Sequence, residues 1–346
     1  PGQRTTGAKA QKSGIGGRGW PGTLPAGVTE YKSPTLMVWL LGRLFDHRVA
    51  LVAGLIVALD PFYVAHSRVL HLDGVTTTLM TLSLLWLLLW LHRGRRRRDL
   101  LLSGVMAGLA AVNKSPALFM APVAGLLIAA DALAVRRPRT VREAFGLLGP
   151  LARVVVVPVA LWGAAATAAY VVVWPAMWVH PIASLRAVLG GAESYADQGH
   201  EGGNYFWGRP VVDPGPAFYP VAWALRTTPV AMLGLVLAAL VGWRRRRPDE
   251  RASGVQAALL ALVAFALLFA LVMTGGAKKF DRYLLPIFPA LNIVAGWGIA
   301  TALVAWGERG MRRRQADDRD DTGASTASAA SATSATSATS SVDATM

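Results

Sequence analysis

Two aspartates, two histidines and an arginine lie in one short stretch of this chain, between two strongly apolar segments. The stretch covers residues 59–73 and reads Leu-Asp-Pro-Phe-Tyr-Val-Ala-His-Ser-Arg-Val-Leu-His-Leu-Asp. The segments on either side of it, residues 49–59 and 74–91, are apolar enough to lie within a membrane. Polar groups at that depth are costly unless they have partners or a function. We therefore expect this stretch to form one wall of an active site that faces the outer side of a membrane.

The residue types in this stretch indicate two chemical roles. Asp73 is a candidate catalytic residue, because a carboxylate held against a hydroxyl group can accept its proton as the nucleophile forms. Arg68 is a candidate phosphate ligand, because a guanidinium group can bind a phosphate through two parallel hydrogen bonds. The alternative interpretation is that such charged groups are interfacial anchors and structural ion pairs. For Asp73 and Arg68 together we favour the functional interpretation.

A metal site is a further interpretation of the same stretch. His66, His71 and Asp73 carry imidazole and carboxylate groups that can ligate a transition metal. Two histidines five residues apart do not align on one face of a helix, however. We therefore predict no metal ligands here, and the sequence leaves dependence on a divalent metal open.

The composition indicates a polytopic membrane protein. Apolar residues make up 53% of the 346 residues and charged residues 16%, whereas a soluble domain has about 25% charged residues. The net charge of +15 arises from Lys and Arg in short runs beside apolar segments, as the positive-inside rule expects. This pattern argues against nucleic-acid binding. Basic residues alone provide electrostatic attraction to a nucleic acid, but they do not make a surface that reads its bases. The absence of cysteine excludes disulfides, thiolate metal sites and a cysteine nucleophile.

The apolar segments predict an all-α protein with about eight to nine transmembrane helices in a domain over residues 33–308. Residues 1–32 are basic and glycine-rich, and we interpret them as disordered or as the end of a truncated upstream region. Residues 309–346 are predicted to form a disordered, cytoplasmic tail rich in Ala, Ser and Thr. The spacing of Gly104 and Gly108 allows another helix to approach closely. The predicted crossings are residues 49–65, 73–91, 100–112, 116–135, 154–174, 218–243, 254–273 and 283–306, after a partial helix over 34–45.

This topology places every Arg-rich run on the cytoplasmic side and collects a set of polar residues on the outer side. The outer residues include a long extracytoplasmic loop, residues 175–216. Aromatic rings stack on sugars, so the aromatic residues in the middle of this loop are candidates for a glycan-binding lid. The candidates for binding a donor phosphate are Arg68, Lys114, Lys279 and Arg282, and those for contact with the sugar or acceptor are Asp60, His66, Tyr205 and Trp207.

Several motifs together resemble glycosyltransferase family 39, the relatives of dolichyl-phosphate-mannose protein mannosyltransferases and of lipid A aminoarabinose transferase. The resemblance extends over roughly residues 35–306. The motifs are Gly-Arg-Leu-Phe-Asp-His-Arg-Val-Ala-Leu at 42–51, Ala-Leu-Asp-Pro-Phe at 58–62, Ser-Arg at 67–68 with Leu-Asp at 72–73, Asn-Lys-Ser-Pro-Ala-Leu at 113–118, Asp-Pro-Gly-Pro-Ala-Phe-Tyr-Pro at 213–220 with Arg-Thr-Thr-Pro at 226–229, and Lys-Lys-Phe-Asp-Arg-Tyr-Leu-Leu-Pro at 278–286.

The resemblance implies a multi-pass enzyme of the type C glycosyltransferase fold in the cell membrane, with its active site on the extracytoplasmic side. Such enzymes move a sugar from a polyprenyl-phosphate donor to a protein, lipid or glycan acceptor. Asp73 matches the second aspartate of the family, which supports binding or catalysis. The family's expected base, in the first outer loop, has no match in residues 1–32, where Glu30 is the only acid. We therefore interpret the chain as lacking the family's first helix and loop.

Two other functions fit the same pattern less well. A transporter or flippase for a polyprenyl-linked or amphipathic substrate would place charges near the middle of the membrane and often shows internal repeats. No clear repeat is present here, and the polar groups gather at one face. A non-catalytic membrane remnant of the enzyme is the third interpretation, which the unmatched base would permit.

Overall fold

The computed structural model of the chain describes residues 26–69, 71–136, 148–197, 203–244, 250–276 and 278–340. The disorder predicted for residues 1–32 falls outside the described residues as far as residue 25, whereas residues 26–32 are helical and belong to α1. The elements, in chain order, are α1 (Ala26–Leu44), α2 (His47–Ala58), α3 (Pro61–Arg68), α4 (Leu72–His92), α5 (Arg97–Asn113), η1 (Ser115–Phe119), α6 (Met120–Arg136), α8 (Leu148–Val173), α9 (Ala176–Val179), α10 (Pro181–Asp197), β1 (Asn204–Phe206), β2 (Arg209–Val211), α11 (Phe218–Arg226), α12 (Pro229–Arg244), α13 (Glu250–Thr274), η2 (Asp281–Leu284) and α14 (Ile287–Ser340).

The predicted helical membrane architecture is confirmed, although the number of crossings is not. Five helical segments of the described chain are long and apolar enough to span a membrane, or up to seven if each of two bent pairs is one span. The crossing expected over residues 49–65 is bent by 59° between α2 and α3. The bend falls at Asp60 and Pro61, because proline has no N–H group to continue the hydrogen bonds of α2. The crossing expected over residues 218–243 is bent by 107° between α11 and α12.

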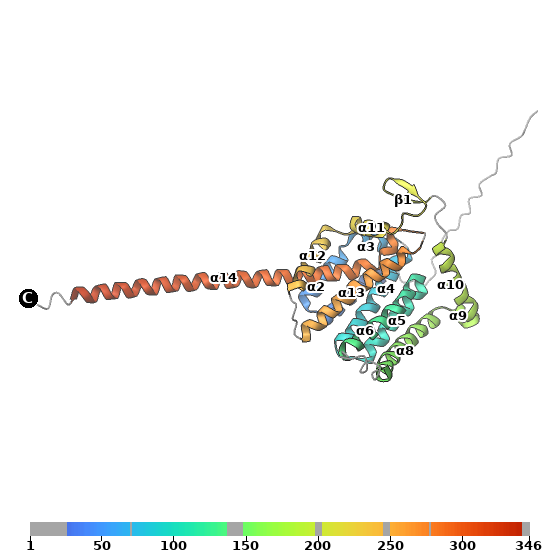
Figure 1. Cartoon of the computed structure of the whole chain (residues 1–346), viewed down its shortest axis with the longest axis horizontal. Helices are drawn as coiled ribbons and strands as arrows, with labels where there is room; N and C mark the ends of the chain where they lie inside the picture. The colour runs from blue at the N-terminus through green and yellow to red at the C-terminus, as the bar shows by residue number, and fades with distance from the viewer. Residues whose placement is uncertain are drawn as a thin grey trace, which may run out of the picture.

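Helix α4 forms the centre of the bundle. It contacts α1, α3, α5, α6, α13 and α14, and the side chains of residues 80–91 are almost all buried. Helices α5 and α8 pack side by side next to it, and α14 packs against α2, α12 and α13 (Figure 1). Because both faces of α4 are covered, Asp73 in its first turn occupies a fixed position at one end of the bundle.

The close approach predicted from Gly104 and Gly108 is confirmed, and its partner is α8. A methyl group at either glycine would collide with a backbone carbonyl of α8, that of Trp162 or of Ala166. The indole Nε1 of Trp162 then donates to Ser103 Oγ on α5, at 2.9 Å. Small residues thus let the two backbones touch, which is the usual basis of helix packing in membranes.

Helix α14 is longer than the sequence predicts. It continues to Ser340, past residue 309, where the chain was expected to become a disordered tail. Its last part extends away from the bundle as a single helix (Figure 1).

The long connection over residues 175–216 contains α9, α10 and a two-stranded antiparallel hairpin of β1 and β2. The hairpin stands out from the helices beside α11 (Figure 1). The site described next is built from the turn between α3 and α4, the short helix η2 and this hairpin.

Candidate functional site

Helices α3 and α4 each begin at a side chain that caps the helix. Asp60 precedes α3, and its Oδ1 accepts a hydrogen bond from the backbone N–H of Tyr63 at 2.8 Å. His71 precedes α4, with its Nδ1 3.4 Å from the backbone N of Asp73. Gly74 lets the two helices approach, because a Cβ there would lie 2.9 Å from the Cα of Ser67. Asp73 is thereby held at the N-terminus of α4, where the helix dipole stabilises a negative charge.

Three basic groups from separate parts of the chain surround Asp73, which is 5% exposed. Lys114 Nζ donates a hydrogen bond to Asp73 Oδ1. His71 Nδ1 lies 2.9 Å from Asp73 Oδ2, and Arg282 Nε lies 3.7 Å from the same oxygen. A buried carboxylate requires such partners, because an unpaired charge is costly away from water. We refer to Asp73, His71, Lys114 and Arg282 as the Asp73 cluster.

Lys114 reaches Asp73 because α5 ends one residue earlier, at Asn113. The Asn113 Nδ2 donates to the carbonyl oxygen of Leu72 at 2.8 Å and to Thr76 Oγ1 at 2.6 Å. These bonds join the end of α5 to the first turn of α4. The Lys114 Nζ also lies 5.0 Å from the centre of the Tyr283 ring, within the range of a cation–π contact.

A small cavity of about 20 Å³ adjoins the Asp73 cluster. Buried polar atoms in proteins are usually hydrogen-bonded. Three atoms of the cavity lining, Asp73 Oδ2, Thr77 Oγ1 and Arg282 Nε, are buried without such a bond. The cluster therefore presents both an acceptor and donors to a polar group that enters the cavity. The lining residues are Asp73, Thr76, Thr77, Met80, Lys114, Pro116, Phe269, Met273, Arg282, Tyr283 and Pro286.

Three of the five residues expected to act on the donor thus come together, and two lie elsewhere. Arg68 is exposed at the end of α3 and does not line this cavity. The Lys279 side chain is 2% exposed, and its Nζ donates to Asp213 Oδ1 at 2.7 Å and to the Gly276 carbonyl at 2.8 Å. Lys279 is therefore already bound to the Asp213 carboxylate. The hydrogen bond from its ammonium group lowers the pKa of Asp213 below its ordinary value.

The structure gives Asp60 a structural position rather than one facing a substrate. Its Oδ2 accepts a hydrogen bond from Asn292 Nδ2 of α14 at 2.9 Å, and the residue is 1% exposed. Both of its oxygens are thus engaged within the protein. His66 Nδ1 lies 3.0 Å from the carbonyl oxygen of Phe62, within the same helix. Among the described residues, no three His, Asp or Glu side chains are grouped so that they could hold a metal ion.

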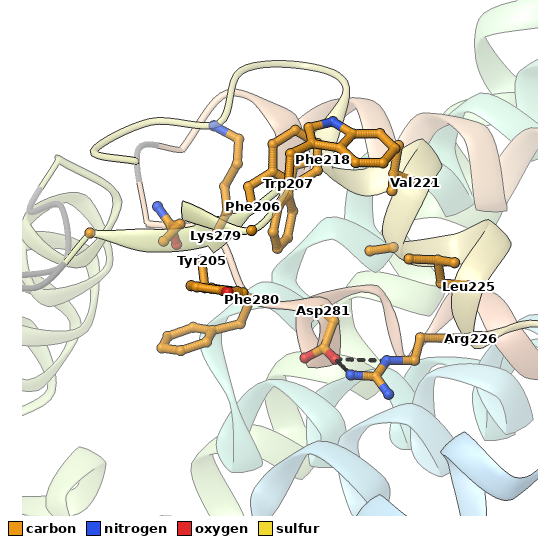
Figure 2. Close-up of a pocket in the computed structure, with 14 residues that line it drawn as sticks. Tyr205, Phe206, Trp207, Phe218, Val221, Leu225, Arg226, Lys279, Phe280 and Asp281 are labelled. Atoms are coloured by element: carbon orange, nitrogen blue, oxygen red, sulfur yellow. Dashed lines mark hydrogen bonds and ion pairs between the residues drawn. The ribbon is translucent and has the colours of Figure 1, made fainter. Parts of the chain in front are cut away.

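A second and larger pocket of about 680 Å³ lies beneath the hairpin. Side chains of the hairpin and of α11 face each other across it (Figure 2). An ion pair between Arg226 and Asp281 closes one end, with the Arg226 Nη2 2.7 Å and the Arg226 Nε 3.0 Å from Asp281 Oδ2. Its lining residues are Gly203, Asn204, Tyr205, Phe206, Trp207, Gly208, Phe218, Val221, Ala222, Leu225, Arg226, Lys279, Phe280 and Asp281. We refer to it as the hairpin pocket.

Comparison with known families finds a match over the first part of the chain. The family model of dolichyl-phosphate-mannose-protein mannosyltransferases matches residues 14–162. The predicted family resemblance is confirmed there. These residues include the helix ends that carry Asp73, His71 and Lys114. None of the curated proteins matches the chain significantly.

Comparison with solved structures covers most of the remaining chain. The crystal structure of ArnT from Cupriavidus metallidurans bound to undecaprenyl phosphate matches with a TM-score of 0.50 at 14% identity. The match covers 79% of this chain and 44% of ArnT. The fold is therefore that of type C glycosyltransferases, and the chain is a multi-pass membrane protein that spans less than half the length of ArnT. The apo structure of the same ArnT matches with a TM-score of 0.42 at 15% identity, over 82% of this chain and 46% of that one.

Sequence reasoning identified Asp73, Lys114 and Arg282 but missed the residues that hold them in place. Asn113 is the clearest of these, since its amide group connects α5 to α4. Asn113 opens the motif at residues 113–118, but the motif does not say which groups its amide contacts. Arg226 and Asp281 lie in two of the recognised motifs, but their ion pair joins residues 55 positions apart. Spacing along the chain does not predict such a contact.

Proposed function

We propose that this chain transfers a sugar from a polyprenyl-phosphate donor to an acceptor outside the cytoplasm, with the Asp73 cluster at the reacting bond. The observation that carries this proposal is a buried carboxylate among basic groups, with unpaired polar atoms facing a cavity. The family match over residues 14–162 and the likeness to ArnT, solved with undecaprenyl phosphate, support it.

The charge balance of the cluster favours a phosphate. Lys114 and Arg282 carry two positive charges, and Asp73 carries one negative charge. Among these three side chains, one positive charge is left over in a partly buried place, where electrostatic attraction is stronger than in water. The phosphate of the donor can therefore bind against Lys114 and Arg282 while Asp73 keeps both cations in place.

The reaction follows from this arrangement. The bond between the anomeric carbon and the phosphate oxygen breaks, and the acceptor hydroxyl oxygen forms a new bond to that carbon. The proton of the hydroxyl passes to a carboxylate, for which Asp73 Oδ2 is the candidate. His71 Nδ1 lies 2.9 Å away but accepts from the backbone N–H of Asp73, so it donates no proton to this oxygen. Polyprenyl phosphate leaves as an anion, and Lys114 and Arg282 stabilise the charge that develops on it.

The remaining predicted residues have lesser parts in this proposal. Arg68 lies exposed at the end of α3, where it can attract an anionic donor without touching the reacting bond. Lys279 contributes to a phosphate site only if it leaves Asp213. We therefore propose that Lys114 and Arg282 are the principal phosphate ligands.

The location of the site on the outer side of the cell membrane is part of the same proposal. Asp73 is at the start of α4, a helix of 21 residues, and the arginine run at residues 93–98 follows its end. These two places are about 30 Å apart along the helix, which is the thickness of the apolar part of a bilayer. Because arginines gather on the cytoplasmic side, Asp73 falls on the opposite side.

The test is a transfer assay with the chain reconstituted in lipid nanodiscs. Undecaprenyl phosphates that carry radiolabelled glucose, mannose or 4-amino-arabinose are supplied with a membrane extract as acceptor. We expect release of undecaprenyl phosphate from one donor, and a loss of about 10²-fold or more in Asp73→Asn and Lys114→Met. Arg48→Met, on the predicted cytoplasmic side, is the matched control and should retain activity. Movement of an intact donor across the bilayer without its cleavage would instead indicate a flippase.

A further inference from the structure

The hairpin of β1 and β2 exposes the aromatic rings of Tyr205 and Trp207, and the geometry of its turn does not call for a tryptophan. Strands β1 and β2 are joined by Trp207 and Gly208, both with positive φ, at 51° and 78°. Such a two-residue turn favours Asn-Gly or Gly-Gly, because a side chain at positive φ is strained. A bulky tryptophan at that position therefore points to a functional role, since backbone strain gathers at such sites. Tyr205 and Trp207 are 76% and 75% exposed, so both rings are accessible to a ligand.

The hairpin pocket combines aromatic faces with hydrogen-bonding groups. Phe206 and Phe218 line it with their ring centres 5.7 Å apart, and Phe280 and Trp207 extend the aromatic surface (Figure 2). The Arg226–Asp281 pair supplies donors and acceptors at one end. The volume of about 680 Å³ falls within the range of about 300–1,000 Å³ for sites that hold small molecules.

The charges of the pocket favour a neutral ligand. Its two cations are both paired with carboxylates, Arg226 with Asp281 and Lys279 with Asp213. A phosphate or another anion would have to displace one of these carboxylates. A pyranose ring needs no such displacement, because its C–H face stacks on an aromatic ring while its hydroxyl groups bond to charged pairs.

The hairpin pocket and the Asp73 cavity are lined by neighbouring residues of one segment. Lys279, Phe280 and Asp281 line the hairpin pocket, and the next two residues, Arg282 and Tyr283, line the Asp73 cavity. One short segment thus separates the two spaces. Residues 279–283 therefore contribute to both sites.

We propose that the hairpin pocket binds the carbohydrate part of the acceptor, with Trp207 and Tyr205 stacking on sugar rings and the Arg226–Asp281 pair bonding to hydroxyl groups. This inference rests on the proposed glycosyl transfer and names the class of acceptor as a glycan. A peptide acceptor fits less well, because the strands of the hairpin are three residues each and offer little edge for backbone pairing.

The experiment measures sugar binding without any donor. The chain in nanodiscs is titrated with neutral trisaccharides of glucose, mannose, galactose and arabinose, and saturation-transfer NMR reports which of them binds. We expect at least one to bind and Trp207→Ala to weaken it about tenfold. Trp207→Phe keeps an aromatic face and should bind within about threefold of the wild type. Trp306→Ala removes an equally exposed tryptophan of α14, outside the pocket, and serves as the control.

Three results would overturn the inference: no trisaccharide binds, Trp207→Ala binds as well as the wild type, or a Ser/Thr-rich peptide binds in a Trp207-dependent way instead of a sugar. The two proposals fail in different ways. Cleavage of a donor with no binding of any trisaccharide rejects the glycan acceptor alone. Trp207-dependent sugar binding with no cleavage of any donor rejects glycosyl transfer alone.

Discussion

Replacing Lys114 with methionine removes the ammonium group that bonds to Asp73 and keeps most of the side-chain volume. The Asp73 side chain is 6% exposed, so its charge would stay buried with the longer 3.7 Å contact to Arg282 and the contact to His71. Removing one partner of a buried ion pair costs about 3–5 kcal/mol. Because the Lys114 side chain is itself 23% exposed, we expect the lower end of this range, about 3 kcal/mol. That is a large part of a typical unfolding free energy of about 5–15 kcal/mol.

The assay compares four proteins in mixed micelles: the wild type, Lys114→Met, Asp73→Asn and the double variant. Unfolding by sodium dodecyl sulfate is followed by circular dichroism, which gives the free energy of unfolding for each. The double variant has no buried carboxylate left without its lysine, and Arg282 is itself partly exposed, so we expect it to recover more than half of the loss seen in Lys114→Met. Arg48→Met at an exposed site should change the free energy by less than about 0.5 kcal/mol.

Two results would contradict the ion pair: Lys114→Met is as stable as the wild type, or the double variant is no more stable than Lys114→Met. Either result would mean that Asp73 does not depend on the Lys114 charge. The same variants separate folding from function. Lys114→Arg keeps the charge, so it should restore most of the stability while its different shape lowers donor turnover.

Three further predictions concern the residues that hold the two sites in place. Gly74→Ala places a Cβ 2.9 Å from the Cα of Ser67, so it should lower the unfolding free energy by about 1–3 kcal/mol; unchanged unfolding by sodium dodecyl sulfate would show that α3 and α4 can separate freely. Asp60→Ala removes a helix cap and leaves the amide of Asn292 without its acceptor, so we expect a loss of about 2–4 kcal/mol. In the same assay Asp60→Asn should lose less, and an equal loss would contradict the capping role. The pKa of Asp213 is lower in the folded chain than its ordinary value of 3.8. Its ionised carboxylate therefore stabilises the fold above pH 3.8, and this stabilisation is lost as the pH falls through the pKa of the folded chain. The difference in thermal midpoint between the wild type and Asp213→Asn should therefore shrink on acidification below pH 3.8, and a constant difference would argue against the pair with the buried ammonium group.

The sequence predicts the helices and their environment because both depend on local composition. Apolar segments with arginine runs at one end can satisfy their backbone groups in a membrane only as helices. The break before α3 has an equally local cause, since Asp60 and Pro61 stop one helix and start the next. The contact of α5 with α8 follows from Gly104 and Gly108, although their spacing alone does not say which helix approaches.

The partners of the charged residues depend on contacts between distant parts of the chain. Asp60 bonds to Asn292, 232 residues away, and Lys279 bonds to Asp213, 66 residues away. Both residues were expected to face a substrate, since a charged residue at an outer helix end has no visible partner in the sequence. The packing of α14 against α2 and the return of the chain through the hairpin supply those partners.

Hydropathy acts locally, so the sequence is enough to predict a helical membrane protein. It also indicates Asp73 as a residue of interest, through its place between two apolar segments. The convergence of Lys114, His71 and Arg282 on that carboxylate, without Lys279, depends on the tertiary structure. The physical reason is that a buried charge is stable only where its partners meet in space, and that meeting is set by the packing of α4, α5 and η2.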